Sequence, residues 1–237
     1  MFSVDTYVHR RNELKKQMKS GLVLFLGNED SPMNYPDNMY HFRQDSSFLY
    51  FWGLETQGLA AIIDLDEDRE ILFGYNFGVD DIVWMGSQLS MTEKARSVGA
   101  KESGSLGDLE KYLSEAIRKG RKIHYLPQYR GDNIIKIEKL LGIHPRLVND
   151  YASEELIKAV VALRSVKSDE EVKEIEYALE ISYRMQTEAM RLTRPGMYER
   201  EIAGLIEGIT LTRGKGVSFP IIFPFTAKRC TITGTKT

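Results

Sequence analysis

The sequence has little of what several protein classes require. It contains one cysteine among 237 residues, which excludes an internal disulfide framework. No apolar run approaches the length of a membrane span, and residues 1–16 lack the apolar core of a signal peptide. With 32 basic and 34 acidic residues the net charge is −2, which gives no bulk attraction to nucleic acid or to an anionic membrane. We therefore expect a cytoplasmic protein that has neither nucleic acid nor a membrane as its partner.

Histidine is also scarce, and its positions match no metal-ligand spacing. His9, His41, His124 and His144 fall on different predicted elements. Cys230 has no cysteine or histidine partner nearby, so a role as nucleophile is not supported. The chain itself therefore offers no catalytic residue and no metal ligand, and we expect it to bind no metal.

Residues 1–150 alternate between strand and helix patterns, which predicts an α/β domain with a central sheet covered by helices. The all-apolar run Leu22–Leu26 is typical of a strand buried on both faces. A charged turn at residues 66–69 separates two apolar segments and predicts a hairpin. Strand patterns occupy residues 22–26, 46–51, 58–65, 70–74 and 122–126, and helix patterns occupy 5–20, 105–119 and 132–141.

A different pattern begins near Ser153 and continues to residue 223. Ser168 and Glu171 form a capping-box signature that opens a long amphipathic helix, and a second helix follows over residues 199–211. Residues 217–223 read as an apolar strand. Two helices and one strand cannot bury these apolar stripes alone, so we interpret residues 151–223 as the incomplete start of a second domain.

The last fourteen residues, 224–237, break this patterning. Five of them are threonine, and the only cysteine of the chain lies among them. From Phe225 onward, a reading frame shifted by one base is compatible with Val-His-Gly-Glu-Thr-Leu-His-Asn-His-Gly-His-Lys-Asn. We interpret residues 224–237 as an out-of-frame tail that follows the loss of a single base near codon 224.

Several runs together resemble a known family. The segment from Tyr40 to Leu54, with residues 24–28 and 82–86, resembles the N-terminal domain of aminopeptidase P. Residues 163–171 and 194–203 are similar to the opening helices of the catalytic domain of that family, which has the "pita-bread" fold shared with creatinase and prolidase. The resemblance implies a creatinase/prolidase-type α/β domain in residues 1–150, followed by the opening of a pita-bread α+β catalytic domain.

The same resemblance implies a parent protein that is a metal-dependent Xaa-Pro aminopeptidase. Such enzymes remove the N-terminal residue that precedes proline, using two divalent ions, usually manganese, held by two Asp, two Glu and one His. None of these ligands can be carried over to a position in this chain, so we expect the chain itself to be inactive. A prolidase (Xaa-Pro dipeptidase) fragment and a non-catalytic creatinase-like module for protein binding are the alternatives. Proline-containing peptides are the implied substrates, and a homo-oligomer through the N-terminal domain is expected.

Three residues are candidates for a substrate cleft. In relatives, an aromatic residue in a similar Trp-x-Gly context reaches the substrate cleft of a neighbouring subunit. Trp84 matches that context. Core packing is the ordinary alternative explanation for this tryptophan. Arg43 and Asp45 lie between aromatic residues, where they could shape the edge of the domain near a cleft. The alternative for this pair is a structural polar network that fixes the loop.

Overall fold

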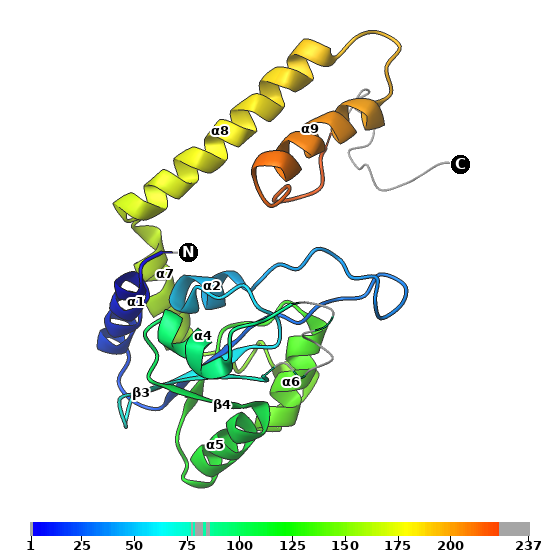
Figure 1. Ribbon diagram of the computed structural model, residues 1–237. Coiled ribbons are helices and arrows are strands. Elements are labelled where there is room, and N and C mark those ends of the chain that lie inside the picture. The colour runs from blue at the N-terminus through cyan, green and yellow to red at the C-terminus, as the bar shows by residue number, and fades with distance from the viewer. Residues whose placement is uncertain (1, 77, 79–82, 84–85, 223–237) are drawn as a thin grey trace. The chain divides into compact units, whose positions relative to one another are not determined.

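The computed structural model describes residues 2–76, 78, 83 and 86–222, and the chain divides into two compact units, Met1–Val166 and Lys167–Thr237 (Figure 1). The division lies later than the predicted boundary at residue 150. The reason is helix α7 (Glu154–Ser165), which contacts α1 (Val4–Gln17) and buries Leu156 in the core of the first unit. The assignment of these units to domains of a larger enzyme stays a prediction.

The first unit is built on a mixed five-stranded sheet of order β4-β3-β2-β1-β5. β1 pairs antiparallel with β2, and β2 pairs antiparallel with β3, which confirms the predicted hairpin. The outer pairs, β1 with β5 and β3 with β4, are parallel. The strands are β1 (Leu22–Leu26), β2 (Ala60–Asp64), β3 (Arg69–Gly74), β4 (Glu102–Ser105) and β5 (Ile123–His124).

Helices cover both faces of this sheet, as the α/β prediction requires (Figure 1). Side chains along β1 alternate between two cores, with Val23 and Phe25 in one and Leu22 and Leu24 in the other. The core around Phe25 is completed by α1, α2 (Ser46–Trp52), α4 (Met91–Ser97) and α7. The other core is completed by α5 (Leu106–Arg118) and α6 (Gly131–Leu141), and a short 3₁₀ helix spans Pro145–Leu147.

The prediction of a strand over residues 46–51 was wrong, because this segment is helix α2. Asp45 caps the helix by accepting hydrogen bonds from the backbone amides of Ser47 at 2.9 Å and Phe48 at 2.8 Å. Gly53 ends it in the left-handed region, with φ of 64°, and a Cβ there would lie 2.1 Å from the ring of Tyr7. A short apolar run has no clear period, so its apolar pattern alone does not distinguish a helix from a strand.

The second unit contains α8 (Asp169–Leu192) and α9 (Glu199–Arg213), which pack together through Ala189, Ile202 and Ile206. The predicted capping box of Ser168 and Glu171 is confirmed. The predicted strand over 217–223 was wrong over its described part, since residues 217–222 form no strand. A strand needs a neighbour to pair with, and the described residues of this unit supply none. Residue 223 and the interpreted out-of-frame tail lie outside the described residues.

None of the helices in the described part of the chain is both long and apolar enough to cross a membrane. The cytoplasmic location stays a prediction.

Candidate functional site

Two of the three predicted cleft residues lie in the loop that joins β1 to α2, and the third, Trp84, lies outside the described residues. Arg43 has an exposed side chain, whereas Asp45 is half-buried because its carboxylate caps α2. Between them lies Gln44, which is only 4% exposed and which no local pattern in the sequence marks. The buried side chain of this loop is thus the neutral Gln44, and the charged side chains on either side of it are exposed or half-buried.

The side-chain amide of Gln44 makes four hydrogen bonds to the backbone. Its Oε1 accepts from the amide of Asn28 at 2.7 Å and from the amide of Asp45 at 2.9 Å. Its Nε2 donates to the carbonyl oxygens of Leu54 at 3.2 Å and Thr56 at 2.9 Å. These bonds use the whole capacity of the amide, and they fasten the loop before α2 to the end of β1 and to the segment that enters β2.

Asn28, at the end of β1, connects this loop to the segment after β5. Its Nδ2 donates to the carbonyl oxygen of Arg43 at 2.8 Å and to the hydroxyl of Tyr129 at 3.1 Å. Because β1 and β5 are parallel neighbours, their carboxyl ends meet at the same edge of the sheet. The loops that follow the two strands thus lie side by side, with Arg43 and Tyr129 brought together from distant parts of the sequence.

Two cavities border this edge, and Tyr129 lines both. The larger, of about 610 Å³, contains the exposed guanidinium of Arg43 and the start of α6. The smaller, of about 300 Å³, is bordered by Asp45, by β1 and by apolar side chains of α7. The structure thus brings Arg43 and Asp45 to adjacent cavities, which we name the Arg43 crevice and the Asp45 crevice. The Arg43 crevice is lined by Asn28, Asp30, Ser31, Pro32, Tyr40, Arg43, Tyr129, Arg130, Gly131 and Asp132.

The Arg43 crevice has mixed charge. Arg130 forms an ion pair with Asp132, with Nη2 and Oδ2 3.0 Å apart. Burial and the nearby charge of Glu29 raise the pKa of Asp30 above its usual value. The crevice therefore offers hydrogen-bond donors and acceptors together with exposed tyrosine rings, and it holds no paired nucleophile and base.

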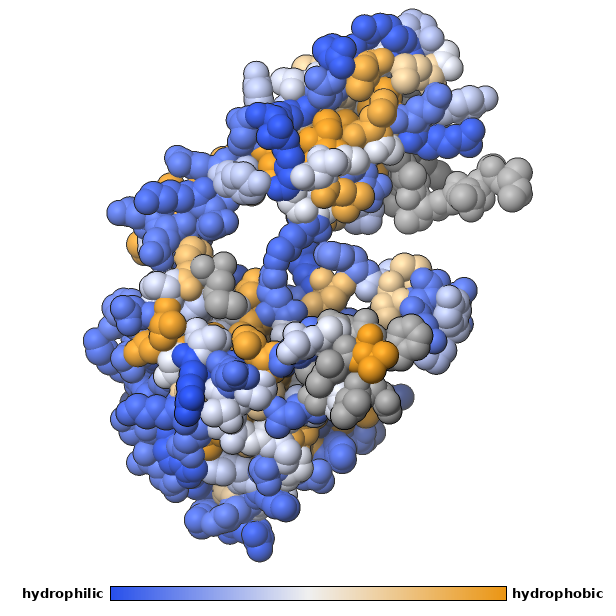
Figure 2. All heavy atoms as spheres, in the orientation of Figure 1, coloured by the Kyte–Doolittle hydropathy of each residue, from blue (hydrophilic) through white to orange (hydrophobic). Residues whose placement is uncertain are grey.

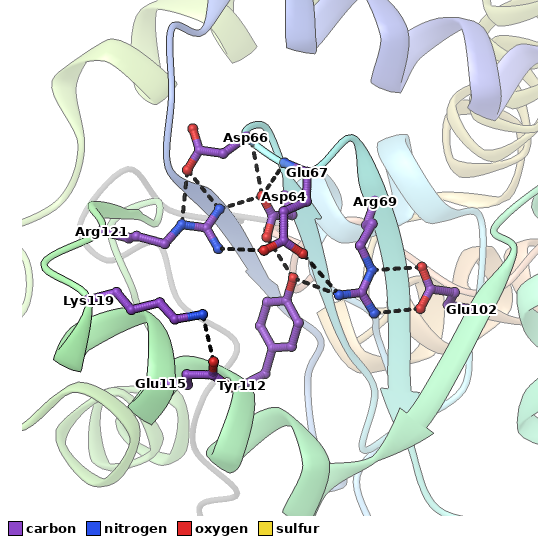
Figure 3. Close-up of polar contacts among 9 residues, drawn as sticks. All are labelled: Asp64, Asp66, Glu67, Arg69, Glu102, Tyr112, Glu115, Lys119 and Arg121. Atoms are coloured by element: carbon purple, nitrogen blue, oxygen red, sulfur yellow. Dashed lines mark hydrogen bonds and ion pairs between the residues drawn. The ribbon is translucent and has the colours of Figure 1, made fainter.

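A second polar cluster lies at the hairpin between β2 and β3 (Figure 3). Asp64 is fully buried, and it accepts hydrogen bonds from the guanidinium of Arg121 and from the hydroxyl of Tyr112, the latter at 2.6 Å. The same carboxylate accepts from the backbone amides of Asp66 and Glu67, both at 3.0 Å. Figure 3 shows both oxygens of this carboxylate occupied by donors from the hairpin, α5 and the segment before β5.

The protonation states in this cluster follow from its contacts. Burial alone would raise the pKa of Asp64, but the hydrogen bonds from Arg121 and Tyr112 outweigh that effect and hold the pKa below its usual value. Burial and the bond to Asp64 raise the pKa of Tyr112. On the other side, Arg69 binds both carboxylate oxygens of Glu102, at 3.0 and 2.7 Å. All these groups satisfy one another, so the cluster joins the hairpin to its neighbours and has no free group for catalysis.

Metal-ligating side chains are not gathered in the described part of the chain, where no three of His, Cys, Asp and Glu could hold an ion. His124 is buried, with Nδ1 2.6 Å from the hydroxyl of Ser153 and Nε2 3.1 Å from the carbonyl oxygen of Ser20. Because that carbonyl can only accept, Nε2 carries the proton and the Ser153 hydroxyl donates to Nδ1. The described residues therefore do not fit a two-manganese site.

Comparison with known proteins gives consistent results. The family model for "Aminopeptidase P, N-terminal domain" matches residues 7–125, half of the chain. The chain is 26% identical to the Xaa-Pro aminopeptidase of Escherichia coli over 213 residues, which cover 86% of this chain and 48% of that relative. It is also 26% identical to human Xaa-Pro dipeptidase over 200 residues, 81% of this chain and 38% of the relative.

Solved structures show the same fold. The low-pH form of Escherichia coli aminopeptidase P matches with a TM-score of 0.74 at 21% identity, over 90% of this chain and 50% of that one. A zinc-substituted form of that enzyme in complex with product matches with a TM-score of 0.73, at the same identity and coverage. The chain thus spans about half the length, or less, of the relatives that it matches.

Proposed function

Because this chain belongs to the family of the aminopeptidase P N-terminal domain, we propose that it is the N-terminal portion of a metal-dependent Xaa-Pro aminopeptidase. The observation that carries the proposal is the family match over residues 7–125, in a chain whose curated relatives include Xaa-Pro aminopeptidases and Xaa-Pro dipeptidases. In this proposal the parent protein removes the residue before proline from the N-terminus of peptides.

We assign the metal chemistry to the parent protein and not to this chain. The described residues hold no cluster able to bind an ion, so no catalytic step is assigned to any of them. The presence of two manganese ions in the parent is part of the proposal. A zinc-substituted neighbour among the solved structures supports a metalloenzyme parent and does not identify its native metal.

Within this proposal, Trp84, Arg43 and Asp45 contribute to the edge of a substrate cleft. The exposed guanidinium of Arg43 lies at the crevice and forms no ion pair with another described residue, so it can bind a peptide carboxylate or carbonyl. Asp45 is less available, since its carboxylate caps α2. We therefore expect Arg43 to affect the KM for peptides in the parent, and Asp45 to affect stability first.

A direct experiment tests the assignment. The purified chain should release no residue from an Xaa-Pro peptide in the presence of manganese. One base inserted near codon 224 should restore the reading frame, and the DNA that follows should then encode Asp, Asp, His, Glu and Glu in that order. The protein made from the repaired gene should release the residue before proline when manganese is present. Activity of the chain alone would contradict the view that it lacks the ligands. A stop codon soon after the repaired site, or a downstream frame without those carboxylates, would contradict the proposed parent.

The same assay separates the two peptidase alternatives. The 26% identity to human Xaa-Pro dipeptidase favours prolidase as the second candidate. A prolidase parent should cleave Xaa-Pro dipeptides and leave longer peptides intact, whereas an aminopeptidase parent should cleave both tripeptides and longer peptides. A repaired chain that has no activity but still binds a partner protein would support the non-catalytic module instead.

A further inference from the structure

The Arg43 crevice holds four charged side chains, and two of them cancel each other. Arg130 and Asp132 form an ion pair in which Nη2 and Oδ2 are 3.0 Å apart. Arg43 and Asp30 line the same cavity, and neither forms an ion pair with another residue in the described part of the chain. A ligand with a single charge would leave one of these two groups unmatched. The crevice therefore suits a zwitterion, a small molecule that carries both an ammonium and a carboxylate.

Arg43 and Tyr129 form the group that fits a carboxylate. The buried Asn28 holds both residues, because its Nδ2 donates to the carbonyl oxygen of Arg43 at 2.8 Å and to the hydroxyl oxygen of Tyr129 at 3.1 Å. The Tyr129 hydroxyl thus accepts from Asn28, and its own proton reaches no acceptor among the residues that the structure describes. A guanidinium and a hydroxyl proton at one cavity are the donors that a carboxylate requires.

Asp30 and Tyr40 form the second group, at the base of a hairpin over residues 31–40. The backbone nitrogen of Tyr40 donates to the carbonyl oxygen of Ser31 at 2.9 Å, which places Tyr40 opposite the residue that follows Asp30. On this hairpin, the blue segment at the right of Figure 1, hydrophobic and hydrophilic residues lie together (Figure 2). Burial and the charge of Glu29 raise the pKa of Asp30, so a cation that enters the crevice would stabilise its carboxylate. An ammonium that carries an apolar ring therefore fits this group, because Tyr40 is 58% exposed.

We propose that the Arg43 crevice binds a peptide of two or three residues that begins with proline and ends in a free carboxylate. The ammonium of the proline binds Asp30 with its ring against Tyr40, and the carboxylate binds Arg43 and Tyr129. The cavity of about 610 Å³ lies within the range of small-molecule sites, about 300–1,000 Å³, and aromatic side chains commonly bind proline rings. The choice of proline rests on the proposed function, whose reaction leaves a peptide that begins with proline, whereas the two charged contacts rest on the crevice alone.

Isothermal titration calorimetry on the full chain tests these contacts with the peptide Pro-Ala-Ala at neutral pH. We expect a Kd of about 1 mM or tighter, as for a ligand of this size. Amidation of the carboxylate should weaken binding about tenfold, and acetylation of the proline nitrogen should weaken it by a similar factor, because each change removes a charge-assisted hydrogen bond. Ala-Ala-Ala keeps both charges and lacks the ring, so it should bind about threefold more weakly.

Two variants assign each charge of the peptide to one side chain. Arg43→Gln should bind Pro-Ala-Ala and its amide equally, because the carboxylate has then lost its partner. Asp30→Asn should bind Pro-Ala-Ala and its N-acetyl form equally, and each variant should keep the wild-type response to the other modification. Arg146→Gln is the matched control, because Arg146 is an exposed arginine of the first unit that lies outside the crevice. It should keep every preference of the wild-type chain.

Several results would overturn the proposal. These are no binding of Pro-Ala-Ala at about 10 mM, wild-type binding of the amide or the N-acetyl peptide as tightly as of the free peptide, and displacement of the peptide by an equal concentration of inorganic phosphate. Equal affinity for Ala-Ala-Ala would overturn the assignment of proline. Because the binding is measured on this chain, it is separate from the test of the parent enzyme. A repaired gene that encodes no metal ligands would contradict the proposed parent and would leave the peptide binding intact.

Discussion

Oε1 of Gln44 lies 2.7 Å from the backbone nitrogen of Asn28, and this hydrogen bond fastens the loop before α2 to the end of β1. The two residues are sixteen positions apart, and neither is charged. Their contact places Arg43 at one cavity and Asp45 at the next, on either side of a buried amide. The positions of the predicted cleft residues thus depend on a neutral side chain between them.

Replacement of Gln44 by alanine should lower the free energy of unfolding of the first unit by about 3 kcal/mol. The change removes four hydrogen bonds and leaves buried backbone groups without partners. Each unpaired group costs about 1–3 kcal/mol, and water that enters the vacated space partly offsets this cost. Denaturant unfolding followed by tryptophan fluorescence measures the effect. Gln17→Ala is the control, because Gln17 is exposed at the end of α1, and it should change stability by less than about 0.5 kcal/mol. Equal effects of the two substitutions would contradict the role of Gln44.

Gly27→Ala should also destabilise the protein, for a steric reason. A Cβ at this position would lie 2.8 Å from the carbonyl oxygen of Leu59 and 3.1 Å from Oε1 of Gln44. Because the first contact is to backbone, the strand edge must move, and we expect a loss of about 1–3 kcal/mol. Gly131→Ala at the start of α6 meets nothing within 4 Å, so it should be neutral or slightly stabilising. A melting temperature unchanged by Gly27→Ala would show that this edge is more adaptable than the contacts indicate.

Asp64→Asn should destabilise the hairpin between β2 and β3. The amide would present a donor to Arg121 or Tyr112, both of which donate to the carboxylate in the native protein. We expect a loss of about 2–3 kcal/mol, as for a hydrogen-bonded buried charge. Asp68→Asn is the matched control, since Asp68 is 85% exposed in its ion pair with Lys15 and should contribute less than about 0.5 kcal/mol. Thermal melts of both variants measure the loss of stability. Similar losses in Asp64→Asn and Asp68→Asn would contradict the special role of Asp64.

The buried His124 predicts a pH dependence of stability. Burial lowers the pKa of His124 below its ordinary value of 6.5, so the unfolded state binds a proton more readily than the folded state. The contribution of neutral His124 is therefore complete above pH 6.5 and is lost as the pH falls towards the folded pKa. The slope in this window is at most about 1.4 kcal/mol per pH unit. Urea unfolding between pH 7.5 and pH 5.5 measures it.

His124→Gln should flatten that slope, although it also lowers stability at pH 7.5 through the lost contacts to Ser153 and Ser20. His41→Gln, at an exposed position, should leave the slope unchanged. A slope that persists in His124→Gln would assign the pH dependence to other groups.

The end of the first unit can be tested by truncation. Residues 1–166 should unfold cooperatively, because this segment contains both cores of the sheet. Residues 1–150 lack three buried side chains of α7, Leu156, Ala159 and Val160. Their loss exposes apolar surface of α1 and should lower the free energy of unfolding by about 3 kcal/mol or more. Differential scanning calorimetry of the two segments compares them. Equal melting temperatures would show that the first unit is already complete at residue 150.

Much of the fold could be predicted from local patterns. The run Leu22–Leu26 is apolar at every position and is shorter than an ordinary helix, so it favours a strand buried on both faces, which is what β1 is. The charged turn at residues 66–69 and the capping box of Ser168 are local signals that need no distant partner, and both predictions were confirmed. The resemblance to the aminopeptidase P family also rested on local runs of sequence, and the family match confirmed it.

Other features depend on distant contacts. The segment 46–51 has apolar side chains that suit a helix or a strand, and the choice was made by the Asp45 cap and by the packing of Phe48 and Phe51 in the core. The strand predicted over residues 217–223 is absent from its described part, residues 217–222, because a strand forms only where another strand pairs with it.

The sequence by itself determined strand β1, the hairpin between β2 and β3 and the capped start of α8, because apolar runs, turns and caps act within a few residues. Tertiary structure alone decided that Gln44 would hold the loop between Arg43 and Asp45, and that Tyr129 would meet Asn28, 101 residues away. The contact between Tyr129 and Asn28 arises because parallel pairing of β1 with β5 brings the ends of both strands to one edge of the sheet. Pairing between strands so far apart leaves no local pattern in the sequence, so it becomes visible only when the sheet is assembled.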